Sequence, residues 1–229
     1  MPRLVIALLL IVALTASPAE QNPVTAVDIL LEPDATMLRH AEANNARLLK
    51  VYPKGFALDE AHRPHITLLQ RFVRTADLDQ VYAAAEKVLA GANVARMQLE
   101  AFKYYYTPGK DLDVAGIDIR RTSALLTLQQ ELIAAIAPLT LETGPIGAFT
   151  ASHDDPAHDA LLISYVSTFV PEQTGERFNP HVSTGVAPRD YLDKCSPNRL
   201  RHSPSRPRVR LSTSSARSAR LRRNSRNGI

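Results

Sequence analysis

Two short runs of this chain match each other in residue type, and their histidines stand 116 positions apart. They are Pro64-His65-Ile66-Thr67 and Pro180-His181-Val182-Ser183, each a proline, a histidine, an aliphatic residue and a hydroxyl residue. Side chains at positions i and i+2 of a strand point to the same face. Each run therefore predicts a strand with an imidazole and a hydroxyl on one face and an aliphatic side chain towards a core.

The match between the two runs is unlikely to have arisen by chance. Proline makes up about 5% of average sequences, so few histidines carry this combination of neighbours by chance. The histidines that lack the pattern are His40, His62, His153, His158 and His202. For either run alone, a histidine that merely packs and hydrogen-bonds within a strand is the competing interpretation. The two runs together favour a shared site built from both halves of the chain.

Apolar periodicity and turn residues divide the chain into alternating strands and helices. Strands are expected at Val24–Leu31, His65–Phe72, Met97–Tyr106, Leu112–Ile119, Leu139–Glu142 and His181–Val186. Helices are expected at Pro33–Val51, Ala76–Leu89 and Ser123–Ile136, and another begins near Pro188. The pattern of Asp155–Phe169 fits a helix or a strand equally well. This order predicts an α+β or α/β architecture, of which we favour α+β.

The chain begins with features typical of a secretory signal peptide. Arg3 precedes the apolar run Leu4–Leu14, and small residues follow up to Ala19. The run is about half the roughly 20 residues that a membrane-spanning helix needs. We expect residues 1–19 to be cleaved after Ala19, which predicts an exported protein with no stable membrane span. An uncleaved anchor or a buried first strand is the alternative.

The last 35 residues differ in composition from the rest of the chain. Residues 195–229 contain ten arginines, eight serines and no acidic residue, whereas residues 1–194 carry 17 basic and 23 acidic side chains. The net positive charge therefore belongs to this segment and does not indicate a basic nucleic-acid-binding body. A disordered basic tail is one interpretation. A shift of reading frame near Lys194 is the other, which sequencing of the gene across this junction would test.

A second cluster of polar residues lies at His153–Asp159, which gathers imidazoles and carboxylates. Such side chains can hold a divalent ion. However, Pro156 breaks any helical face here, and acidic loops are usually just solvated. We therefore expect no metal site in this segment.

With the two histidine runs placed on strands in the two halves, the chain resembles the two-histidine phosphoesterase superfamily, which includes the bacterial 2'-5' RNA ligase and cyclic phosphodiesterase group. Leu69-Gln70 after the first run, and Phe178-Asn179 before and Gly185 within the second, also resemble that family. The resemblance covers residues 24–194. It implies a bilobal α+β fold in which two pseudo-symmetric halves surround a central cleft lined by both motifs.

The resemblance also implies roles for four residues. His65 and His181 would be the catalytic pair, and Thr67 and Ser183 would bind the phosphate. An imidazole can give and take a proton near neutral pH, as hydrolysis of a 2',3'-cyclic phosphate of a nucleotide or RNA end requires. Reversal of the two roles would give 2'-5' RNA ligation. This chemistry needs no metal and no organic cofactor. The sequence does not decide which histidine is the acid.

We expect the protein to be a monomer. Two other functions stay open at this point. The same cleft could bind a nucleotide or RNA end without turning it over. Alternatively, the arginine-rich tail could be the functional element and bind nucleic acid by charge alone.

Overall fold

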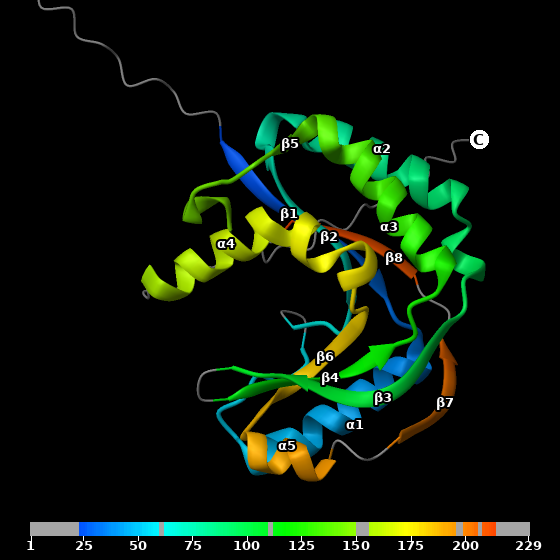
Figure 1. The fold of residues 1–229 in the computed structure, drawn as a ribbon, viewed down its shortest axis with the longest axis vertical. Coiled ribbons are helices and arrows are strands. Elements are labelled where there is room, and N and C mark those ends of the chain that lie inside the picture. Colours follow the sequence, from blue (N-terminus) through cyan, green and yellow to red (C-terminus); the bar gives the residue numbers. More distant parts are fainter. Residues whose placement is uncertain are drawn as a thin grey trace, which may run out of the picture.

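The computed structural model describes residues 23–59, 62–109, 112–149, 156–195, 199–205 and 208–213, for which it shows two antiparallel sheets and five α-helices (Figure 1). The strands are β1 (Val24–Glu32), β2 (Ile66–Arg74), β3 (Leu99–Thr107), β4 (Asp113–Ile119), β5 (Thr140–Leu141), β6 (His181–Ala187), β7 (Arg199–Ser205) and β8 (Arg208–Thr213). The α-helices are α1 (Ala35–Val51), α2 (Leu78–Gly91), α3 (Ser123–Ile136), α4 (Pro156–Gln173) and α5 (Arg189–Cys195). The predicted signal peptide lies outside the described residues.

Each sheet contains four strands, in the orders β5-β2-β1-β8 and β6-β4-β3-β7. All neighbouring strands are antiparallel. The two motif strands, β2 and β6, therefore belong to different sheets, as the separation of the two runs predicts. The α+β prediction is confirmed, whereas the division into two pseudo-symmetric lobes around a cleft stays a prediction.

Local sequence signals explain where the helices begin. The Asp34 side chain accepts hydrogen bonds from the backbone amides of Thr36 and Met37, at 3.1 and 2.9 Å, and so caps α1. The Thr122 hydroxyl caps α3 in the same way, by accepting from the amide of Leu125 at 3.2 Å. Both caps satisfy amides that have no partner within the helix.

The helices cover the sheets through one main hydrophobic core and two smaller buried clusters. Helices α2 and α3 lie side by side against the first sheet, and α1 packs against β6 of the second sheet (Figure 1). Both sheets and the helices contribute to a single buried cluster, whose members include Ile29, Met37, Leu68, Leu99, Ile117, Leu128 and Val182. The aliphatic residues of both motifs, Ile66 and Val182, belong to it, as the strand alternation predicts.

The ambiguous segment Asp155–Phe169 is helical in its described part, where it forms most of α4. Its apolar residues lie on several sides of the helix, so neither a helical nor a strand period stands out in the sequence. Val166 on α4 packs against Ala26 of β1 and Phe72 of β2. No helix in the described ranges is long and apolar enough to cross a membrane.

The structure differs from the predicted disordered tail in two segments. Strand β7 pairs with β3, and β8 pairs with β1, so each closes an edge of one sheet (Figure 1). Pairing of strands uses backbone amides and carbonyls, which a polar segment supplies as well as an apolar one. In addition, Arg208–Thr213 alternates polar and apolar residues over its first four positions, a pattern that suits a strand. The rest of residues 196–229 lies outside the described residues.

Candidate active site

The two motif histidines are held by the same backbone contact. His65 directly precedes β2 and His181 is the first residue of β6. Nδ1 of His65 lies 2.7 Å from the carbonyl oxygen of Arg63, and Nδ1 of His181 lies 2.7 Å from that of Asn179. A carbonyl oxygen only accepts hydrogen bonds, so each Nδ1 must carry the proton. This tautomer leaves the Nε2 atom of each ring to exchange a proton with a ligand.

Each motif strand also contains a β-bulge immediately after its hydroxyl residue. The β1–β2 register skips Leu68, which follows Thr67, and the β4–β6 register skips Thr184, which follows Ser183. Bulges bend a strand and redirect the side chains beside them, and they are common next to active sites. The two halves thus share a backbone feature as well as a residue pattern.

A buried amide from a packed helix holds the bulge in the first motif. The side chain of Gln129, on α3, is fully buried. Its Nε2 donates to the carbonyl of Leu68 at 3.0 Å, and its Oε1 accepts from the amide of Gly175 at 3.2 Å. Gly175 lies in the segment that leads to His181. Gln129 therefore links the first motif strand to the approach to the second motif.

Asn45 forms the reciprocal link from α1. Its Nδ2 donates to the carbonyl of Thr184, the bulged residue of the second motif, and to that of Phe56, each at 2.9 Å. Its Oδ1 accepts from the amide of Leu58 at 3.2 Å. Phe56 and Leu58 lie in the segment that leads to His65. Both links therefore connect a bulge of one motif with the chain that precedes the other.

Two buried aspartates lie beside the motif strands, Asp28 on β1 and Asp118 on β4. Oδ2 of Asp28 accepts from the Thr67 hydroxyl at 3.5 Å and from Nε2 of Gln70 at 3.1 Å. Oδ2 of Asp118 forms an ion pair with Lys103 at 3.0 Å. Within the described residues, the Oδ1 atoms of both aspartates are buried and have no hydrogen-bond partner. Among the described residues, Asp118 thus forms an ion pair with a lysine, whereas Asp28 does not.

The strands of the two motifs approach one another in space. Strands β2 and β6 come within 8 Å of each other between Cα atoms, although they belong to different sheets. Burial lowers the pKa of His181 from its usual 6.5, and the charge of His65 lowers it further, against the opposing effects of the Asn179 carbonyl and Asp118. The charge of one motif histidine thus affects the protonation of the other.

The comparison with known families adds a finding that does not depend on this geometry. Residues 38–194, well over half of the chain and including both motifs, match the sequence model of the 2'-5' RNA ligase superfamily. The chain belongs to this superfamily. Its members are enzymes of the phosphoesterase and RNA ligase type that act on RNA or nucleotide cyclic phosphates. Among curated proteins, the search found no match.

In this superfamily member, an aromatic ring packs against the second motif histidine. Tyr105 of β3 meets the ring of His181 edge-on, with 5.1 Å between ring centroids. Gly116 of β4 makes this position available, since a Cβ atom there would lie 2.6 Å from the Tyr105 ring. Burial is the main cause that raises the pKa of Tyr105, so its phenol keeps its proton at neutral pH.

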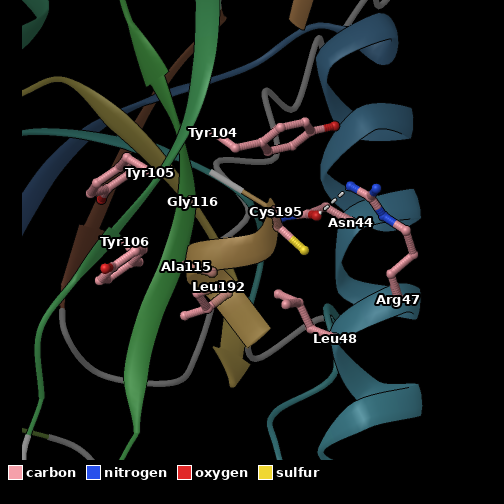
Figure 2. Close-up of a pocket in the computed structure, with 10 residues that line it drawn as sticks. All are labelled: Asn44, Arg47, Leu48, Tyr104, Tyr105, Tyr106, Ala115, Gly116, Leu192 and Cys195. Atoms are coloured by element: carbon pink, nitrogen blue, oxygen red, sulfur yellow. Dashed lines mark hydrogen bonds between the residues drawn. The ribbon is translucent and has the colours of Figure 1, made fainter. Parts of the chain in front are cut away.

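A small cavity shares Tyr105 and Gly116 with the surroundings of His181 but is too small to hold the substrate. It lies between α1, the strands β3 and β4, and α5, and its volume is about 20 Å³ (Figure 2). Tyr104 points into the space beside α1, whereas Tyr105 points away to the other side of β3 (Figure 2). The cavity has room for about one water molecule, which is too little for a nucleotide.

The described residues contain no group of three or more His, Cys, Asp or Glu side chains that could hold a metal ion. The segment His153–Asp159 falls largely outside the described side chains, so both interpretations of it stand. The sequence analysis missed Asp28 and Asp118, although a signal exists for them. Each is an aspartate between two aliphatic residues of a strand, in Val27-Asp28-Ile29 and Ile117-Asp118-Ile119.

Proposed function

We propose that this protein hydrolyses 2',3'-cyclic phosphates of nucleotides or RNA ends, with His65 and His181 as the two groups that transfer protons. The observation that carries the proposal is the repeated contact of each Nδ1 atom with a backbone carbonyl, on two strands that approach within 8 Å between Cα atoms, which leaves each Nε2 atom to exchange a proton. Membership of the superfamily supports the reaction class.

In this reaction, a water molecule attacks phosphorus and the bond from phosphorus to one ribose oxygen breaks. One Nε2 takes a proton from the water, and the other Nε2 gives a proton to the departing ribose oxygen. The attack of a ribose hydroxyl in place of water would give the RNA ligase reaction. The lowered pKa of His181 favours this residue as the proton acceptor, because a base must be neutral before it reacts.

Thr67 and Ser183 supply hydroxyl donors for the non-bridging phosphate oxygens. In the unliganded protein, the Thr67 hydroxyl donates to Asp28 over 3.5 Å, which is a long hydrogen bond that rotation of the hydroxyl can break. Each hydroxyl lies two residues after the histidine of its motif and therefore on the same face of the strand as that histidine.

The proposal is tested by incubating the full-length protein with 2',3'-cyclic AMP in the presence of a chelator and following the formation of adenosine monophosphate. We expect turnover, and His62→Ala as a control should keep it, since His62 is exposed and pairs with Asp59 outside the motifs. Tight binding of the cyclic nucleotide by wild type, with no product after long incubation, would instead identify a non-catalytic binding protein. Absence of both binding and turnover would refute the proposal.

Removal of either hydroxyl should slow the reaction without unfolding the protein. We expect Thr67→Ala and Ser183→Ala each to lower kcat by roughly 10²- to 10³-fold, as the loss of one donor to a developing charge does in other enzymes. The exchanges Thr67→Ser and Ser183→Thr keep the donor and should restore most of the rate. Equal losses in the alanine and the hydroxyl-bearing variants would show that the hydroxyl is not the group that matters.

The pH dependence should reflect the environment of His181. Because burial lowers its pKa below 6.5, His181 stays neutral at pH values where a free imidazole is partly protonated. The acid limb of kcat/KM should therefore lie below pH 6.5. Asp118 raises the pKa of His181, so Asp118→Asn should move this limb to still lower pH. An acid limb that moves to higher pH in this variant would contradict the assignment of His181 as the base.

A further inference from the structure

Helix α4 lies on the same side of the first sheet as the first motif. Along β1, Ala26 and Asp28 share a face because side chains alternate. Asp28 contacts Thr67 on this face, and Ala26 belongs to a small buried cluster with Phe72 of β2 and Val166 of α4. The helix therefore covers the part of this face that adjoins the motif hydroxyl.

Tyr165 of α4 is a partly exposed ring in this position. It is 44% exposed, although its neighbour Val166 is buried. Phe169, buried one turn later, meets the ring edge-on with 5.7 Å between centroids. One edge of Tyr165 is thus supported by the core while part of the ring remains open to a ligand.

Tyr165 belongs to the helix that packs against β2, the strand of the first motif. It interacts electrostatically with Asp28, which contacts Thr67, and with Tyr105, which contacts His181. Burial is the main cause that raises its pKa, and the charge of Asp28 adds to this effect. Tyr165 is thus a partly exposed ring on the helix that packs against the strand of the first motif.

The chemistry of α4 limits what could bind beside Tyr165. The helix contains no lysine or arginine, and its only acidic residues are Asp159 and Glu172. Leu161, one turn before Tyr165, is 70% exposed. The helix itself therefore offers no lysine or arginine for a further phosphate of an RNA backbone, whereas an aromatic ring suits the flat face of a nucleobase.

We propose that Tyr165 stacks on the base of the substrate, so that the protein acts on nucleoside 2',3'-cyclic phosphates or on a terminal nucleotide recognised through its base. This inference rests on the proposed phosphodiesterase function and adds a subsite to it. The phosphate lies between the two motifs, and the base extends from there towards α4.

The experiment compares two substrates, 2',3'-cyclic AMP and methyl riboside 2,3-cyclic phosphate, which has the same reacting group but no base. Tyr165→Ala should raise KM for the nucleotide by roughly 5- to 150-fold, the range found for loss of one base–aromatic stack. It should leave kcat/KM for the base-free substrate unchanged. Tyr165→Phe keeps the ring and should behave like wild type.

Tyr82→Ala is the matched control, because Tyr82 lies on α2 and outside both motifs. It should change neither substrate's kinetics. An unchanged KM for 2',3'-cyclic AMP in Tyr165→Ala, or an equal loss with both substrates, would overturn the inference. Calorimetric binding of 2',3'-cyclic AMP to His181→Ala, with and without Tyr165→Ala, gives the same comparison without turnover. If wild type hydrolyses neither substrate but Tyr165→Ala still weakens this binding, the proposed reaction fails and the base subsite stands.

Discussion

Substitution of either motif histidine by alanine is expected to lower kcat for 2',3'-cyclic AMP hydrolysis by roughly 10²- to 10⁴-fold. His65 and His181 each present one Nε2 atom, because their Nδ1 atoms are committed to the carbonyls of Arg63 and Asn179. One ring must accept a proton as the other donates one. The loss of either ring therefore removes one of two linked proton transfers, and the double variant should be little slower than the slower single variant.

The measurement is steady-state hydrolysis by both single variants and the double variant, each shown by circular dichroism to be folded. Both histidines are only partly buried, so their removal should leave the core intact. His40→Ala, on α1 and outside the motifs, serves as a control that should keep the wild-type rate. If a folded His65→Ala or His181→Ala protein retained full activity, two-histidine catalysis would have to be abandoned.

The sequence was sufficient to predict the strands that carry the two motifs, because this prediction needs only a period of two and an aliphatic residue that faces the core. The bulges at Leu68 and Thr184 could not be predicted in this way. A bulge exists only relative to a partner strand, and the partners β1 and β4 pair through a register that the motif residues do not encode.

The amide links through Asn45 and Gln129 were missed for a related reason. Both residues occur within helical patterns, where an amide side chain ordinarily faces solvent. Their partners are backbone atoms of segments distant in the sequence, so only the packing of α1 and α3 against the sheets reveals them. Strands β7 and β8 could not be predicted because composition indicates how much apolar surface a segment can bury, and not whether its backbone completes the edge of a sheet.

Asn45→Ala is expected to destabilise the protein by about 2–5 kcal/mol, since each buried polar group left without a partner costs about 1–3 kcal/mol. The substitution removes the partner of the Thr184 and Phe56 carbonyls and of the Leu58 amide. Two of these groups lie in the approach to His65, and the third is the bulge that follows Ser183. We therefore expect the variant to lose stability and to reduce kcat for the fraction that remains folded.

Urea unfolding at equilibrium measures the loss of stability, with Gln80→Ala as the matched control. Gln80 makes one long, exposed hydrogen bond of 3.5 Å to Asp77, so its removal should change the free energy of unfolding by less than about 0.5 kcal/mol. Gln129→Ala removes the reciprocal link and should resemble Asn45→Ala in both stability and kcat. A loss of stability with an unchanged kcat in both variants would show that these amides support the core alone. A loss in kcat measured at urea concentrations well below the unfolding transition would show that the two amide links also position the catalytic groups.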